Sequence, residues 1–214
     1  MFTMDDNFKL RAALKSDEEL HDRINNREKY LPETVEAAVN ELQFRGEVFS
    51  DEELKVIEED MQARKELAES GRESFGLFSR NDKNLQVEDP DAPSFYSKRA
   101  VFGFSILFSV LFGSILLAIN LSKTQNRNKA VWVVLFGLGY IIVAALIAQS
   151  FNSNSSFSIL VIFIGAYLLE ALFWNRYIGN STLYKPRKVW IPLIIGIAIT
   201  VPIIVAILYY GINK

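Results

Sequence analysis

Four long apolar runs fill the second half of the chain and set its fold class. They span residues 100–121, 130–148, 157–174 and 189–210. A helix rises about 1.5 Å per residue, so runs of this length match a hydrocarbon core of about 30 Å. The pattern predicts an all-α polytopic membrane protein, with four transmembrane helices within residues 100–214.

The first half is polar and carries a repeated helix-start signal. The string Ser-Asp-Glu-Glu-Leu occurs twice, beginning at Ser16 and at Ser50. In each copy the serine can cap a helix while the glutamate three residues on, Glu19 or Glu53, reaches back to the serine N–H. These capping boxes predict helices that begin near residues 17 and 51.

A third helix is predicted between the two capping boxes. Pro32 suits the first turn of a helix, and Gly46 suits its end. The residues between them place one narrow apolar stripe at helical spacing: Val35, Ala38, Val39 and Leu42. Residues 1–70 therefore read as a small, soluble helical module.

The turn at about 41–54 resembles the short helical-hairpin module called SHOCT. Seven positions carry the resemblance: Leu42, Arg45, Gly46, Val48, Phe49, Ser50 and Glu53. The resemblance implies association and no catalysis, although SHOCT modules are usually C-terminal and this one precedes the predicted membrane spans. The whole chain also resembles uncharacterised four-span proteins of Bacteroidota, through Tyr30, Pro32, Glu33, Glu41, Leu42, Arg45 and Gly46.

Residues 71–99 read as an acidic, flexible linker that ends in an interfacial collar. Asp89-Pro90-Asp91 combines turn formers and charge with few apolar neighbours. Aromatic and basic residues follow immediately before the first apolar run, as is typical of a membrane interface: Phe95, Tyr96, Lys98 and Arg99.

Charge and composition exclude several classes of function. Residues 1–99 hold 15 Lys and Arg against 24 Asp and Glu, a net charge of −9, and the remainder carries +7. The acidic half lacks a basic patch for phosphate contacts, so nucleic-acid binding is not expected. The chain has no cysteine, and no catalytic motif surrounds its single histidine, His21. We therefore expect no enzymatic activity, no cofactor and no metal.

Small residues recur within the first apolar run. Ser105, Ser109 and Gly113 would share one face of a continuous helix. Such a face lets helices pack closely in a membrane. A narrow pore lined by the hydroxyl groups is the alternative.

Glu170 is the only formally charged residue within the four runs. An intramembrane carboxylate suggests a proton or cation relay. Because it lies about one turn before the aromatic residues near Trp174, it could instead pair with Arg176 or with a neighbouring helix.

The signals for orientation conflict. With four spans, the first and third loops hold 7 basic residues and the terminal side about 5, which favours termini outside. A long charged region without an export signal favours cytoplasmic termini in a bacterial inner membrane, and this is the orientation we expect. The leading function is a membrane anchor or scaffold that binds a protein partner, or itself, through residues 16–70. The alternative is a small transporter or channel that uses Glu170.

Overall fold

The computed structural model describes residues 4–70, 85–124, 126–150, 155–179 and 182–212. These residues are mostly helical, which confirms the helical fold class. The chain divides into two compact units. Unit 1 comprises residues 1–75, 79–93 and 180–186, and unit 2 comprises residues 76–78, 94–179 and 187–214. Each unit is described by itself.

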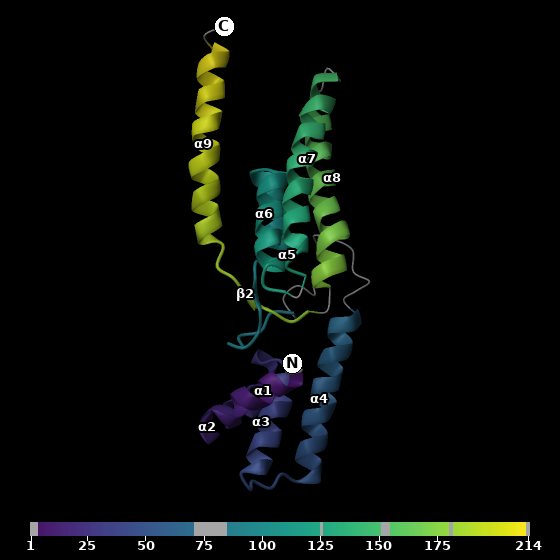
Figure 1. Cartoon of the computed structure of the whole chain (residues 1–214), viewed down its shortest axis with the longest axis vertical. Coiled ribbons are helices and arrows are strands. Elements are labelled where there is room, and N and C mark those ends of the chain that lie inside the picture. Colours follow the sequence, from purple (N-terminus) through teal and green to yellow (C-terminus); the bar gives the residue numbers. More distant parts are fainter. Residues whose placement is uncertain (1–3, 71–84, 125, 151–154, 180–181, 213–214) are drawn as a thin grey trace. The chain divides into compact units, whose positions relative to one another are not determined.

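Unit 1 is built around one central helix, α3. Its elements are α1 (Met4–Ala13), α2 (Asp17–Asn25), the 3-10 helix η1 (Arg27–Lys29), α3 (Pro32–Phe44), α4 (Asp51–Ser70) and the short strand β2 (Lys185–Pro186) (Figure 1). Helix α3 packs against α1 and α2. The apolar stripe expected from the sequence forms much of this core, which contains Ala12, Leu20, Ile24, Val35, Ala37, Ala38, Val39, Leu42 and Ile57.

Both capping boxes are present at the starts of α2 and α4. The Glu19 N–H donates to Ser16 Oγ at 3.3 Å, and the Ser16 N–H donates to the Glu19 carboxylate at 3.1 Å. The same pair of bonds joins Ser50 and Glu53, at 3.2 and 2.9 Å. Gly46 follows α3 with φ of 99°, a conformation that glycine adopts without strain.

Part of the predicted linker packs onto unit 1. Val87 is buried with Leu31 and Ala92 in a second small core. The Val87 N–H donates to the Tyr184 carbonyl at 3.0 Å, and Tyr184 is itself buried. Residues 85–93 are thus an integral part of unit 1, unlike the flexible linker expected from their composition. Residues 71–84 of that linker lie outside the described residues.

The described residues of unit 2 form five apolar helices, two of which are short. Its elements are the short strand β1 (Ser94–Phe95), α5 (Lys98–Leu107), α6 (Val110–Leu121), α7 (Lys129–Ser150), α8 (Ser155–Leu169), the π-helix η4 (Glu170–Ile178) and α9 (Trp190–Ile212). Helix α7 corresponds to the second predicted span, α8 with η4 to the third, and α9 to the fourth.

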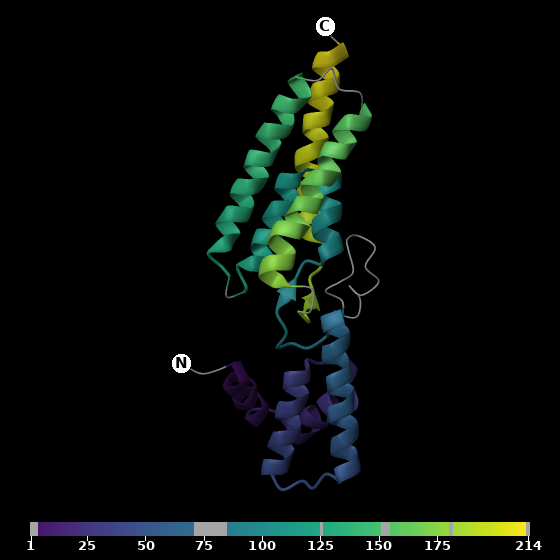
Figure 2. The same ribbon diagram turned by 90° about the vertical axis from the view of Figure 1, so that its right-hand side faces the viewer.

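The first predicted span, residues 100–121, is not a continuous helix. It forms α5 and α6, which fold back on each other, so that a Cβ added to Gly113 would lie only 2.9 Å from the Val101 carbonyl oxygen. Ser109 starts the second helix, because its Oγ accepts from the Phe112 N–H at 3.1 Å. This hairpin lies beside α7, and both ribbon views show α7 and α8 extending beyond its tip (Figures 1 and 2).

Two helices among the described residues are long and apolar enough to cross a membrane by length and composition, where the sequence predicted four. They are Lys129–Gln149 and Ile159–Ile178. The first predicted span fails because the hairpin divides it into helices of 10 and 12 residues. Within α9, the described apolar stretch Trp190–Ala206 falls just short of the length required.

Candidate functional site

A network of polar and aromatic side chains ties together one end of unit 2. We call it the polar girdle, and it consists of Tyr96, Lys98, Asn120, Asn126, Glu170, Asn175, Tyr177 and Arg187. These residues come from the start of α5, the end of α6, the loop before α7, the helix η4 and the segment before α9. The girdle residues thus come from five chain segments and form three sets of contacts: Tyr96 with Asn120 and Arg187, Lys98 with Glu170 and Asn175, and Asn126 with Tyr177.

Glu170 lies in this girdle as half of a buried ion pair. Its carboxylate is 2.8 Å from Lys98 Nζ, and the two side chains are 8% and 14% exposed. Lys98 also donates to Asn175 Oδ1 at 3.2 Å. The sequence left two partners possible for Glu170: Arg176 or a group on a neighbouring helix. The structure shows the second, because Lys98 belongs to α5, while the Arg176 guanidinium lies 5.8 Å from the centre of the Tyr177 ring.

Asn120 closes the base of the hairpin. Its Oδ1 accepts from the Tyr96 N–H and its Nδ2 donates to the Tyr96 carbonyl, both at 2.8 Å. The side chain is fully buried. Sequence reasoning missed this contact, although a lone amide near the end of an apolar run was an available signal. The two bonds hold the start of α5 beside the end of α6.

The small residues predicted to share a helix face meet across the hairpin instead. A Cβ on Gly113 would lie 1.7 Å from Ser105 Oγ, which shows that the two helices are in close contact there. The Ser105 hydroxyl donates to the Val101 carbonyl at 2.8 Å. Ser109 caps α6 at the tip. Because these serines bond within their own chain segment, the geometry favours packing over a hydroxyl-lined pore.

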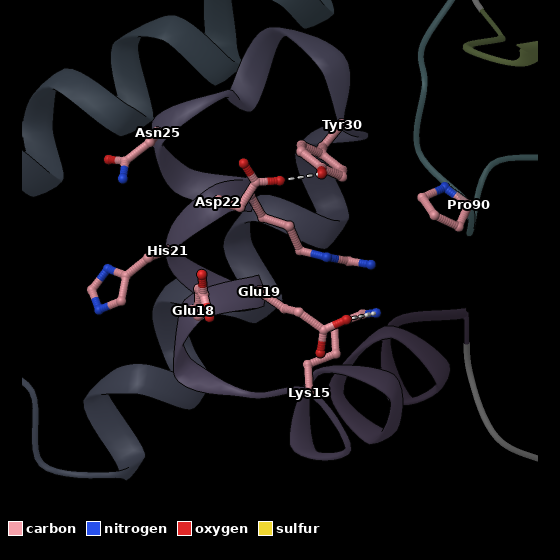
Figure 3. A pocket seen from close by; sticks show the side chains of 9 residues that line it. Lys15, Glu18, Glu19, His21, Asp22, Asn25, Tyr30 and Pro90 are labelled. Atoms are coloured by element: carbon pink, nitrogen blue, oxygen red, sulfur yellow. Dashed lines mark hydrogen bonds and ion pairs between the residues drawn. The ribbon is translucent and has the colours of Figure 1, made fainter.

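Unit 1 contains a polar pocket of about 550 Å³ beside α2. Figure 3 shows Asp22 and Tyr30 pointing toward one another within it, while His21 points away from both. The Tyr30 hydroxyl donates to the Asp22 carboxylate. Other charged or polar residues complete the lining, namely Lys15, Glu18, Glu19, Arg23 and Asn25, together with Pro90.

The ionisable pair in this pocket is poorly suited to acid–base catalysis at neutral pH. The hydrogen bond to Asp22 raises the pKa of Tyr30 to about 12. The same bond, together with one from Asn26, lowers the pKa of Asp22 below its usual value. A general acid or base works best with a pKa near the working pH, and these shifts move both groups away from it. His21 instead pairs with Glu47 at 3.1 Å on the exposed surface.

A buried carboxylate, Asp89, fastens residues 85–93 to the helices of unit 1. Its Oδ2 accepts from the Leu31 N–H at 3.0 Å and from the Thr34 hydroxyl at 2.6 Å. The Arg23 guanidinium lies 4.0 Å from Asp89 and 2.8 Å from Asp91. Sequence reasoning missed this cluster, since no local pattern links Asp89 to partners 55 or more residues away.

Burial opposes ionisation of Asp91, the second acid of this cluster. The hydrogen bond from Arg23 and the charges of Arg23 and Arg11 outweigh that effect and hold the pKa of Asp91 below its usual value. Both guanidinium groups come from the N-terminal helices, Arg11 from α1 and Arg23 from α2. These ion pairs hold residues 89–91 against α1 and α2 within unit 1.

A second hollow in unit 1, of about 480 Å³, lies beside the SHOCT-like turn and is lined by both charged and apolar residues. Its apolar lining is Ile24, Val48, Phe49, Val56 and Ile57. Val48 is 91% exposed, and Phe44, at the end of α3, is 87% exposed. The Arg45 guanidinium, by contrast, binds the Asp17 carboxylate at 2.6 Å. The turn thus pairs its basic residue with Asp17 and exposes Val48, while Phe49 packs against the core of unit 1.

Comparison with known proteins gives no assignment. No protein-family model, no curated protein and no solved structure matches the chain. Among the described residues, no group of three or more His, Asp or Glu side chains is arranged to hold a metal ion. Any function must therefore be argued from the geometry of the two units.

Proposed function

We propose that the chain is a multi-pass integral membrane protein of the bacterial inner membrane that anchors a helical protein-interaction module. One observation carries the membrane part of the proposal: the apolar side chains of α7, α8 and α9 face outward. Exposed examples include Ile142, Val143, Leu146, Ile159, Leu160, Ile194, Ile199 and Ile203. A water-soluble protein would bury such a surface, whereas lipid solvates it.

The proposed role of unit 1 is association with a protein partner or with a second copy of the chain, without catalysis. Its support is the exposed apolar surface beside the SHOCT-like turn, at Phe44, Val48 and Val56. Single exposed apolar residues are normal on soluble proteins, but a hollow flanked by several of them is typical of contact surfaces.

Site-specific crosslinking in native membranes tests this role. A photoreactive residue at Val48 should give a discrete adduct, whose mass distinguishes a second copy from another protein. The same group at Glu36, which is exposed on α3 within the same unit, is the matched control. Equal adducts at both positions, or none at Val48, would show that this surface is not a contact site.

Membrane insertion is tested separately by alkaline extraction of membranes that contain the full chain. An integral protein stays in the pellet and needs detergent for release. Recovery of the chain in the alkaline supernatant would refute the membrane assignment.

The alternative, a small transporter or channel that uses Glu170, receives less support. The carboxylate already faces the Lys98 ammonium group at 2.8 Å, which gives it a structural partner.

A further inference from the structure

We infer that the α5–α6 hairpin enters and leaves the membrane through one face and occupies a single leaflet, whereas α7, α8 and α9 cross both leaflets. The inference rests on the proposed membrane insertion. It differs from the four-span arrangement in one decisive way: the end of α9 lies on the face opposite the polar girdle.

Hydrogen bonds within unit 2 place the two ends of the hairpin at one level. Asn120 binds both backbone groups of Tyr96, and the Arg187 N–H donates to the Phe95 carbonyl at 2.8 Å. A continuous span over residues 100–121 would separate Tyr96 from Asn120 by about 30 Å of hydrocarbon. Four spans would likewise put Phe95 and Arg187 on opposite faces. Direct hydrogen bonds are incompatible with either separation.

Contacts of the hairpin tip with α7 and α8 show how far along these helices the hairpin extends. A Cβ on Gly165 of α8 would lie 2.5 Å from both Val110, at the tip, and the ring of Tyr140. Tyr140 is 11 residues along α7 from Lys129, which is about 16 Å. Helix α7 then continues for 10 more residues to Ser150, about 15 Å farther. The tip therefore lies near the middle of α7, close to the midplane of a bilayer.

The tip is also built for an apolar environment. Non-helical backbone at membrane depth is tolerated where protein covers it and its polar groups are bonded. Phe108 donates its N–H to the Phe104 carbonyl at 3.1 Å, and Ser109 caps the next helix. The rings of Phe104, Phe108 and Phe112 cluster with centroids 5.2–5.5 Å apart. A Cβ on Gly196 of α9 would lie 2.7 Å from the Phe108 ring, so α9 covers one side of the tip.

The positions of the lysines and arginines of unit 2 are consistent with this single-leaflet hairpin. The connection between α7 and α8 carries no charged residue. Basic residues concentrate at cytoplasmic faces, so the girdle face is assigned to the cytoplasm. All eight described lysines and arginines of unit 2 belong to the girdle or lie within three residues of a girdle residue in the sequence: Lys98, Arg99, Lys123, Arg127, Lys129, Arg176, Arg187 and Lys188. In the four-span arrangement, the count of basic residues and the missing export signal favoured opposite orientations. With a single-leaflet hairpin, both favour a cytoplasmic N-terminal region.

Single-cysteine labelling of the full chain tests the arrangement, since the chain has no cysteine of its own. The variants are Asn40→Cys in α3, Asn128→Cys before α7, Gln149→Cys near the end of α7 and Gly211→Cys near the end of α9. A membrane-impermeant maleimide is applied to intact spheroplasts and, in parallel, to permeabilised ones. We expect Asn40→Cys and Asn128→Cys to label only after permeabilisation, and the other two variants to label in intact spheroplasts.

The labelling patterns separate the competing outcomes. Four spans would place Asn128→Cys alone on one face, with the other three variants on the opposite face, and that pattern would overturn the inference. Failure of the proposed function gives a third result, in which all four variants label alike and the chain is released at alkaline pH. The hairpin pattern reversed as a whole would keep the single-leaflet hairpin and overturn only its assignment to the cytoplasmic face.

A distance measurement tests the fold-back directly. Nitroxide labels on Arg99→Cys/Ser122→Cys should show strong dipolar broadening, because both positions lie at the base of the hairpin. A straight helix would separate them by 23 residues, or about 35 Å, which leaves the spectrum unbroadened. An unbroadened spectrum would refute the hairpin even if the labelling pattern were ambiguous about faces.

Discussion

The close contact between Gly113 and Ser105 makes a sharp prediction about stability. An alanine at position 113 would place its Cβ 1.7 Å from Ser105 Oγ, 2.9 Å from Ser105 Cβ and 2.9 Å from the Val101 carbonyl oxygen. The hydroxyl can rotate away, but the other two atoms can separate only if the helices move apart. Overpacking of this kind costs about 1–3 kcal/mol, against a gain of about 0.5–1 kcal/mol from replacing a helical glycine. We expect Gly113→Ala to destabilise the chain by about 1–2 kcal/mol.

Gly103→Ala is the matched control, since it lies on the same hairpin. An added Cβ at Gly103 meets no atom within 4 Å, so this variant should be stabilised by about 0.5–1 kcal/mol. The assay is unfolding of the purified full chain in mild detergent, followed by far-UV circular dichroism as a denaturing detergent is added. Combining Gly113→Ala with Ser105→Gly should recover part of the loss, because the two side chains are in contact while the Val101 carbonyl contact remains.

A straight helix over residues 100–121 gives the opposite expectation. Gly113 and Ser105 would then lie eight residues, or about 12 Å, apart. Gly113→Ala and Gly103→Ala would both be neutral or stabilising, and Ser105→Gly would not rescue anything. Equal stabilities of the two alanine variants would therefore refute the packing argument.

Three further predictions concern the ion pair and the polar groups of unit 1. Glu170→Gln should assemble normally and lower the free energy of unfolding by about 1 kcal/mol in the same assay, and Glu170→Leu should lower it more. If a normally assembled Glu170→Gln instead loses a pH-dependent flux in liposomes, the transport alternative is favoured. Asp89→Ala should lower the stability of unit 1 by about 3 kcal/mol by removing the buried acceptor, while Glu88→Ala at the exposed neighbour should change it by under about 0.5 kcal/mol. Limited proteolysis of the full chain measures the difference, and equal protection of the two variants would contradict the role given to Asp89. The pKa of Tyr30 is raised to about 12, so its contribution to stability is complete below pH 10 and is lost as the pH rises toward 12; ultraviolet titration should find a late-titrating tyrosine whose delay is reduced by Asp22→Asn.

Local signals in the sequence predicted local structure well. The positions of Ser16, Pro32 and Ser50 indicated where α2, α3 and α4 begin, because capping and proline preferences depend on a few neighbouring residues. The lengths and apolarity of the later runs indicated α7, α8 and α9. Such features need no information about the rest of the chain.

Long-range contacts were not predictable in the same way. The 22-residue run 100–121 has the length of a span, and nothing in its hydropathy marks the reversal at Phe108 and Ser109. Its small residues were recognised, but their helical spacing suggested one face rather than two helices in contact. Asp89 looked like part of a turn-rich linker, because its partners are remote in sequence. In each case a tertiary contact overrode a pattern that was correct for an isolated segment.

In the proposed arrangement, the depth of the hairpin also gives unit 2 an asymmetric cross-section. Five helices would occupy the leaflet next to the polar girdle, and three would occupy the other. With a helix diameter of about 10 Å, the two additional helices widen that leaflet by roughly 160 Å². In that arrangement, unit 2 would fit best where the girdle-side monolayer is convex. The fold-back at Phe108 and Ser109 would then favour a curved membrane over a flat one.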